Sequence, residues 1–156
     1  MSTNTNQTGS GTGDDITLQQ LRCEYKTDPL GIGVRRPRLS WVLASTRRGV
    51  AQSAYQIRVV DEQGELWDSG KVSSGQSIHV PYGGSALRSG QRCTWQVRIW
   101  DEMGRPSDWS EPAHWEMGLL QVGDWQADWI TPDWDEDLTQ SQPPRCCVAP
   151  LDLKAR

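Results

Sequence analysis

Hydrophobic and polar residues alternate with a period of two over residues 93–100. One side of the alternation carries Cys93, Trp95, Val97 and Ile99, and the other carries Thr94, Gln96, Arg98 and Trp100. This period, with β-branched and aromatic residues on one side, predicts a half-buried strand. Residues 101–109 then collect Asp, Gly, Pro and Ser, which supply turn geometry or cap backbone amides, and residues 114–117 resume an extended pattern. The stretch 92–118 therefore predicts a strand, a loop and a returning strand.

Five further extended segments precede this pair, at residues 16–25, 38–43, 54–60, 65–72 and 76–82. Turn-forming residues separate them, and none has the pattern of an amphipathic helix. About seven short strands spaced by turns predict an all-β protein with an immunoglobulin-like or fibronectin type III-like β-sandwich.

The alternation also indicates which residues of these segments face the core. In the first strand the inward residues are expected to be Leu18, Leu21, Cys23 and Tyr25. The odd step between Leu18 and Leu21 indicates a bulge. The later core residues are expected to include Trp41, Tyr55, Ile57 and Val59. Pro81 fits an edge strand, because proline has no amide hydrogen to donate.

The charge of the chain excludes one class of partner. A net charge of -4 and a pI near 5.1 give no basic surface for DNA or RNA. No apolar run approaches the roughly 20 residues that cross a bilayer, and the N-terminus lacks the basic and apolar regions of a secretory signal. We therefore expect a cytoplasmic protein with no nucleic-acid or membrane partner. Residues 1–15 have no apolar anchor and predict a disordered leader.

The four cysteines do not have the spacing of a zinc site. They are Cys23, Cys93, Cys146 and Cys147. Buried or idle free thiols are the favoured interpretation. A bridge between Cys23 and Cys93 would require their strands to face each other, and a reducing cytosol argues against it.

No residue pattern points to a catalytic, cofactor or metal site. The one dense acidic run consists of Asp133, Asp135, Glu136 and Asp137, and its proline-flanked sequence is typical of a solvated linker. His79 and His114 are expected to be ordinary outward-facing histidines, since no nucleophile motif accompanies them. Gly31 and Gly33 are not followed by a helix-forming run, so they do not predict a dinucleotide site. We expect no cofactor.

Five tryptophans are candidate contact residues. They are Trp100, Trp109, Trp125, Trp129 and Trp134. If several were exposed on one sheet face, they could form a platform for carbohydrate. The favoured alternative is structural: Trp109 packs at the strand corner, and Trp125 and Trp129 are buried against a second domain.

Several collinear strings resemble the N-terminal region of bacterial α-L-rhamnosidases. They are LRCEY at 21–25, RPRLSW at 36–41, QSAYQIRV at 52–59, LWDSGKV at 66–72 and the run from WQVRIW to WEMGLL at 95–120. The resemblance is ordered along the chain and covers about residues 17–134, which makes it more specific than any single motif.

The resemblance implies a fibronectin type III-like sandwich over residues 16–121, at the front of a multidomain glycoside hydrolase. In that family the string DWQADWI at 124–130 marks the passage into a second β-sandwich domain, and the catalytic (α/α)6 barrel lies further on. Residues 122–156 are then a linker and the incomplete start of that second domain. Residues 145–156 lack strand alternation, which leads to the hypothesis of a truncated or frame-shifted reading frame.

The expected function comes from the same resemblance. The parent would hydrolyse terminal α-L-rhamnosides, whereas this chain alone is expected to be an inactive packing and spacing module whose partner is the remainder of the parent hydrolase. One alternative is a free-standing carbohydrate-binding or protein-interaction module for rhamnose-containing glycans. A third interpretation is that the chain binds a separately made remainder.

Overall fold

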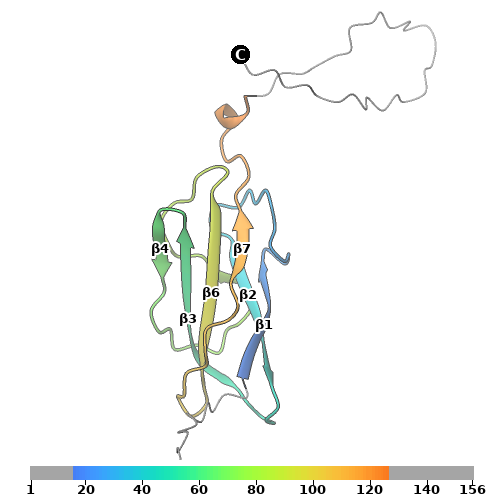
Figure 1. The fold of residues 1–156 in the computed structure, drawn as a ribbon, viewed down its shortest axis with the longest axis vertical. Helices are drawn as coiled ribbons and strands as arrows, with labels where there is room; N and C mark the ends of the chain where they lie inside the picture. The colour runs from blue at the N-terminus through green and yellow to red at the C-terminus, as the bar shows by residue number, and fades with distance from the viewer. Residues whose placement is uncertain (1–15, 127–156) are drawn as a thin grey trace, which may run out of the picture. The chain divides into compact units, whose positions relative to one another are not determined.

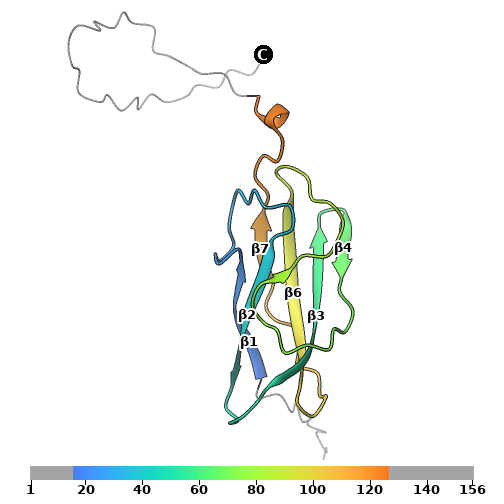
Figure 2. The ribbon, with the colours of Figure 1, turned by 180° about the vertical axis from the view of Figure 1, so that it is seen from behind.

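The computed structural model describes residues 16–126 as two antiparallel sheets packed face to face (Figure 1). The strands are β1 (Ile16–Cys23), β2 (Arg38–Ser45), β3 (Gln52–Asp61), β4 (Gly64–Asp68), β5 (Val80–Pro81), β6 (Arg92–Asp101) and β7 (Ala113–Glu116). One sheet has the order β1-β2-β5 and the other has the order β4-β3-β6-β7, and the two layers are visible from both sides (Figure 2). The predicted all-β immunoglobulin-like sandwich is confirmed.

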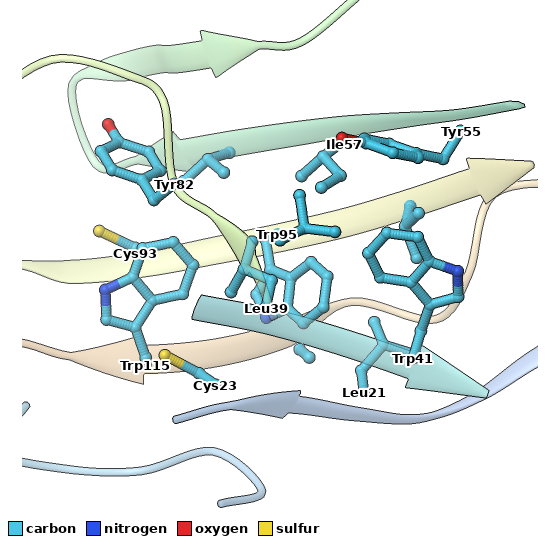
Figure 3. Packing of buried hydrophobic residues seen from close by; sticks show 14 of the residues in the cluster. Leu21, Cys23, Leu39, Trp41, Tyr55, Ile57, Tyr82, Cys93, Trp95 and Trp115 are labelled. Carbon is cyan, nitrogen blue, oxygen red and sulfur yellow. The ribbon is translucent and has the colours of Figure 1, made fainter. Parts of the chain in front are cut away.

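The core lies between the two sheets and is built around tryptophan. The chain has no phenylalanine, and the indoles of Trp41, Trp95 and Trp115 are each 1% exposed. Figure 3 shows these rings reaching into the space between the sheets from β2, β6 and β7. Because each such ring buries about 150–250 Å², a few tryptophans supply the apolar area that this polar chain otherwise lacks.

The central pair of strands, β3 and β6, follows the predicted alternation. Ile57 lies opposite Val97, and Val59 lies opposite Trp95. All four side chains are buried, since successive residues of a strand point to opposite faces and these share one parity. Trp41 is also buried in β2, as its parity predicts.

The first strand confirms one prediction and corrects another. The pairing of β1 with β2 shifts register between Gln19 and Arg22, where the predicted bulge lies. Tyr25, expected to face inward, is instead 61% exposed. The reason is that β1 ends at Cys23, and Glu24 and Tyr25 then adopt left-handed backbone with φ of 47° and 67°. Strand alternation therefore does not continue to Tyr25.

The last two segments before β6 are less regular than their sequence predicts. In residues 65–72 the strand β4 ends at Asp68, and Val72 forms only an isolated bridge with Tyr55. In residues 76–82 only Val80 and Pro81 form a strand. That short strand is at the edge of its sheet, as predicted for Pro81.

The predicted leader, the acidic run, Cys146 and Cys147, and Trp129 and Trp134 lie outside the described residues. Within residues 16–126 no helix is long and apolar enough to span a membrane.

Candidate functional site

Two candidate tryptophans, Trp100 and Trp109, lie in a row of alternating aromatic and cationic side chains on the β4-β3-β6-β7 sheet. The Trp109 ring centre lies 4.9 Å from the Arg58 Cζ atom and 4.8 Å from the Arg98 Cζ atom. The Trp100 ring centre lies 5.0 Å from the same Arg98 atom and 4.5 Å from the Lys71 Nζ atom. These distances are those of cation–π contacts. We call these five residues the Trp–Arg ladder.

Two serines hold the segment that carries Trp109 against β6. The backbone amides of Ser107 and Ser110 donate to the carbonyls of Ile99 and Val97, both at 2.8 Å. In return the two serine hydroxyls accept hydrogen bonds from the amides of Ile99 and Val97, both at 3.1 Å. Each serine thus completes the hydrogen bonding of one β6 residue, which satisfies backbone groups that are costly to leave unpaired when buried.

A hydrogen-bond network fixes the two arginines of the ladder. The Asp68 carboxylate accepts hydrogen bonds from the Gln56 amide at 2.7 Å and from the Arg58 Nε atom at 2.9 Å. The Gln56 carbonyl oxygen in turn accepts one from the Arg98 Nε atom at 2.9 Å. Burial raises the pKa of Asp68, but the hydrogen bonds from Gln56, Gly70 and Arg58 outweigh it and leave this pKa below its ordinary value. The network therefore keeps a carboxylate beside the Arg58 guanidinium and links it through Gln56 to Arg98.

The ladder bears on the two interpretations of these tryptophans. Trp100 is 9% exposed, and both indoles have cationic side chains stacked over them. A sugar ring that stacked on either indole would have to displace a guanidinium or an ammonium group. The geometry therefore favours a structural role for Trp100 and Trp109.

Six carboxyl groups of residues 16–126 accept hydrogen bonds that favour their ionised form. The pKa lies below its ordinary value at Glu24, Asp61, Asp68, Asp101, Glu102 and Asp124. A general acid for glycoside hydrolysis needs a raised pKa so that it holds a proton at working pH. These six groups therefore have the electrostatics of structural anions.

The surroundings of the thiols and histidines also favour structural roles over catalytic ones. Burial raises the pKa values of Cys23 and Cys93 to about 12, so both are protonated and poorly nucleophilic, and both are free rather than bridged. His114 contacts Thr94 through its Nδ1 atom at 3.0 Å. His79, expected to face outward, is half-buried with its Nε2 atom enclosed, because its left-handed backbone (φ 58°) interrupts the alternation. Within the described residues no three His, Cys, Asp or Glu side chains are grouped to hold a metal ion.

Large apolar side chains are exposed on the segments at the end of the domain where β7 terminates. They belong to Leu30, Val34, Leu119, Val122 and Trp125, and we call them the apolar end. Val122 is 96% exposed, Leu30 is 75% exposed and Trp125 is 62% exposed. Val122 belongs to a single turn of 3-10 helix, Val122–Asp124. Exposed apolar side chains of this size at one end of a domain are candidates for an interaction surface.

Backbone contacts hold the two segments of the apolar end together. The Ile32 amide donates to the Glu116 carbonyl at 2.9 Å, and the Gly118 amide donates to the Ile32 carbonyl at 2.8 Å. The Arg35 Nη2 atom donates to the Leu120 carbonyl at 3.3 Å. A Cβ atom at Gly118 would lie 3.1 Å from the Gly31 carbonyl oxygen, so glycine permits this close approach. The loop before β2 is therefore fixed beside the chain that continues from β7 (Figure 1).

Most of these contacts have no signal in the sequence. The alternation of residues 93–100 predicts that Arg98 lies on the outward face of β6. No feature of the sequence predicts its contact with Trp109. Leu30 and Val34 lie in a glycine- and proline-rich loop with no periodicity. Their only signal is the presence of large apolar residues in a turn-forming segment. Trp125, a candidate contact residue from its sequence, is exposed within the described residues.

The described sandwich is similar to the N-terminal domain of a known protein family. The family described as Rha78A-like, N-terminal immunoglobulin domain matches residues 18–121. An alpha-L-rhamnosidase of Streptomyces avermitilis is 46% identical over 113 residues, which cover 69% of this chain and 11% of the relative. An alpha-L-rhamnosidase of Formosa agariphila is 39% identical over 124 residues, which cover 74% of this chain and 13% of the relative.

Solved structures give the same result. The crystal structure of the Streptomyces avermitilis alpha-L-rhamnosidase complexed with L-rhamnose matches with a TM-score of 0.71 and 43% identity, over 74% of this chain and 12% of that one. The structure of the alpha-L-rhamnosidase from Dictyoglumus thermophilum matches with a TM-score of 0.69 and 34% identity, over 74% of this chain and 14% of that one. The matched region is thus a small part of each relative.

Proposed function

Because this chain belongs to the family of Rha78A-like N-terminal immunoglobulin domains, we propose that it is a non-catalytic module that packs against the next domain of an α-L-rhamnosidase. The observation that carries this proposal is the apolar end. In the relatives most of the chain lies outside the matched N-terminal region. The surface around Leu119 and Trp125, beyond β7, is therefore the part of the sandwich that would lie nearest to the next domain of such a parent. Burial of exposed leucine, valine and tryptophan there would stabilise the contact.

The assignment of a non-catalytic role is supported by the carboxyl groups. Glycosidases of the common type hold two carboxyl groups about 5–9.5 Å apart across the scissile bond, one of them protonated. The six carboxyl groups with lowered pKa values accept hydrogen bonds from neighbouring side chains or backbone amides instead. Hydrolysis of terminal α-L-rhamnosides would then belong to the remainder of the parent protein.

An activity assay tests the non-catalytic role. The purified 156-residue chain is incubated with p-nitrophenyl α-L-rhamnoside, and release of nitrophenol is followed. We expect no release above the buffer rate. Turnover that co-elutes with the protein through two orthogonal purification steps would overturn the proposal.

A chimeric enzyme tests the docking role. The matched N-terminal region of the Streptomyces avermitilis enzyme is replaced by residues 16–126 of this chain, with and without the double change Leu30→Ser and Leu119→Ser. Each fully buried leucine contributes about 1.5–3 kcal/mol. We therefore expect the double change to lower the melting temperature of this domain in the chimera by several degrees but to leave the separate 156-residue chain unchanged.

A matched control keeps this test specific. Met103 lies in the turn after β6, at the opposite end of the sandwich from the apolar end, and is 73% exposed. Met103→Ser should change neither melting temperature. Equal effects of the double change in the chimera and in the separate chain would contradict the docking role.

A further inference from the structure

A groove of about 290 Å³ lies on the face of the β1-β2-β5 sheet that is turned away from the core. Outward residues of β2, Ser40 and Val42, line it, and Arg22 of β1 lies along one side. Ile78, in the segment before β5, lines it as well. Tyr25, the residue that leaves the strand pattern after β1, also lines this groove.

Unusual backbone conformations gather around this groove. Five non-glycine residues of the described chain have positive φ, and Gln20, Tyr25 and His79 among them line the groove. Such conformations cost about 1–3 kcal/mol each and persist only where the surrounding structure enforces them. A bulky residue such as Tyr25, at φ 67°, is a rare case. These three side chains thus lie around one groove although their backbone conformations are energetically unfavourable.

Specific contacts enforce this arrangement. The Glu24 carboxylate accepts hydrogen bonds from the Arg38 backbone amide and from the Arg38 Nη2 atom, both at 2.7 Å. This pair fixes the residue just before Tyr25. The His79 amide donates to the Ser40 hydroxyl at 3.1 Å, and the His79 ring meets the Tyr25 ring edge-on with centres 4.8 Å apart. Both sides of the groove are therefore tied to β2 or to each other.

The lining combines an apolar surface with planar polar groups. Tyr25 and Ile78 are 61% and 60% exposed, and Val42 is also exposed. The Arg22 guanidinium and the Gln20 amide supply planar hydrogen-bonding groups on the β1 side. A pyranose has matching chemistry, because one face presents C–H groups to an aromatic or aliphatic surface and its edge presents hydroxyls. A volume near the lower limit of ligand pockets suits one sugar unit.

We propose that this groove binds a pyranose sugar, with Tyr25 as the apolar contact and Arg22 and Gln20 as the hydroxyl-binding groups. Resting on the proposed function, the sugar is a terminal L-rhamnose unit of the glycan on which the parent enzyme acts. Its C6 methyl group suits the aliphatic side chains of Val42 and Ile78. The groove holds the glycan and takes no part in bond cleavage. It differs from the Trp–Arg ladder in exposure: the Arg38 Cζ atom lies 5.5 Å from the Tyr25 ring centre, but Tyr25 is 61% exposed, whereas Trp100 is 9% exposed.

Titration of the ¹⁵N-labelled 156-residue chain with L-rhamnose, followed by NMR, tests this proposal. For a single small groove we expect a Kd on the order of 1 mM, with saturable shifts confined to the amides of Tyr25, Ser40, Val42 and His79. Tyr25→Ala should weaken binding about tenfold, and Arg22→Ala should do the same. Trp125→Ala is the matched control, since Trp125 is an equally exposed aromatic outside the groove, and it should leave the Kd unchanged.

Three results would overturn the proposal. The first is an absence of saturable shifts up to about 50 mM sugar, which is fifty times the expected Kd. The second is shifts that survive Tyr25→Ala and Arg22→Ala in folded protein, and the third is shifts centred on Trp125. The first two results do not bear on docking, because the chimera test changes Leu30 and Leu119, which do not line the groove. A groove that instead receives another protein domain would give no sugar-dependent shifts.

Discussion

The guanidinium group of Arg105 donates two hydrogen bonds to the carboxylate of Asp101, at 2.9 Å from Nε and 2.7 Å from Nη2. The other carboxylate oxygen accepts hydrogen bonds from the backbone amides of Met103 and Arg105, both at 2.9 Å. Asp101 is 1% exposed. Burial raises the pKa of Asp101, but the hydrogen bonds from Arg105 and Met103 outweigh it, so this carboxyl remains ionised. One side chain therefore closes the turn after β6.

We expect Asp101→Ala to lower the melting temperature by about 10 °C, because it removes the hydrogen bonds that the Asp101 carboxylate accepts from Met103 and Arg105. Asp101→Asn should cause a smaller fall, since its amide oxygen can still accept from the two backbone amides. Thermal denaturation followed by circular dichroism measures both. Asp108→Ala changes an exposed carboxylate of the same loop and should have little effect. Equal falls for Asp101→Ala and Asp108→Ala would disprove this role.

Ser107→Ala and Ser110→Ala should each lower the free energy of unfolding by about 1–2 kcal/mol, because each leaves one β6 amide without its hydroxyl acceptor. Urea denaturation measures the loss. Ser73→Ala, at an exposed position, should stay within about 0.5 kcal/mol of the parent chain. A loss at Ser110 no larger than that at Ser73 would show that water replaces the hydroxyl.

Arg98→Ala should destabilise the domain more than Arg58→Ala, because Arg98 contacts both indoles of the ladder and donates to Gln56. A double-mutant cycle between Arg98→Ala and Trp109→Ala should give a coupling of about 0.5–1 kcal/mol. The same cycle between Arg98 and the distant Trp125 is the control and should give a coupling near zero. A zero coupling with Trp109 would mean that the ring and the guanidinium are adjacent without stabilising each other.

Acidification should weaken the contact that fixes Tyr25. The hydrogen bond from the Arg38 side chain holds the pKa of Glu24 below its ordinary value of 4.5. In the unfolded chain Glu24 takes up its proton first as the pH falls, so the stabilisation is present above 4.5 and is lost as the pH drops through the lower folded value. Glu24→Gln should therefore flatten the fall in melting temperature below this pH.

The control for this prediction is Glu62→Gln, at an exposed carboxylate in the turn between β3 and β4. Its melting temperature should show the same acid dependence as that of the parent chain. Identical acid profiles for Glu24→Gln and the parent chain would show that the Arg38 pair does not contribute.

The sequence by itself determined the sandwich and most of its core. The period of two placed Trp41, Ile57 and Val97 on the buried faces, because a strand carries alternate side chains to opposite sides. The composition of residues 101–109 identified a capped turn, since Asp and Ser accept hydrogen bonds from nearby backbone amides. These features are local, so they can be derived from neighbouring residues in the chain.

Only the tertiary structure decided where the exposed aromatic and apolar side chains lie. Tyr25 does not face the core, because left-handed backbone at Glu24 and Tyr25 ends the strand alternation. The contact that holds this backbone joins Glu24 to Arg38, 14 residues further along the chain. The partners of Trp109, Arg58 and Arg98, come from two strands that are adjacent only after the sheet has formed. Sequence spacing carries no record of such pairs, because strand register and loop packing bring them together.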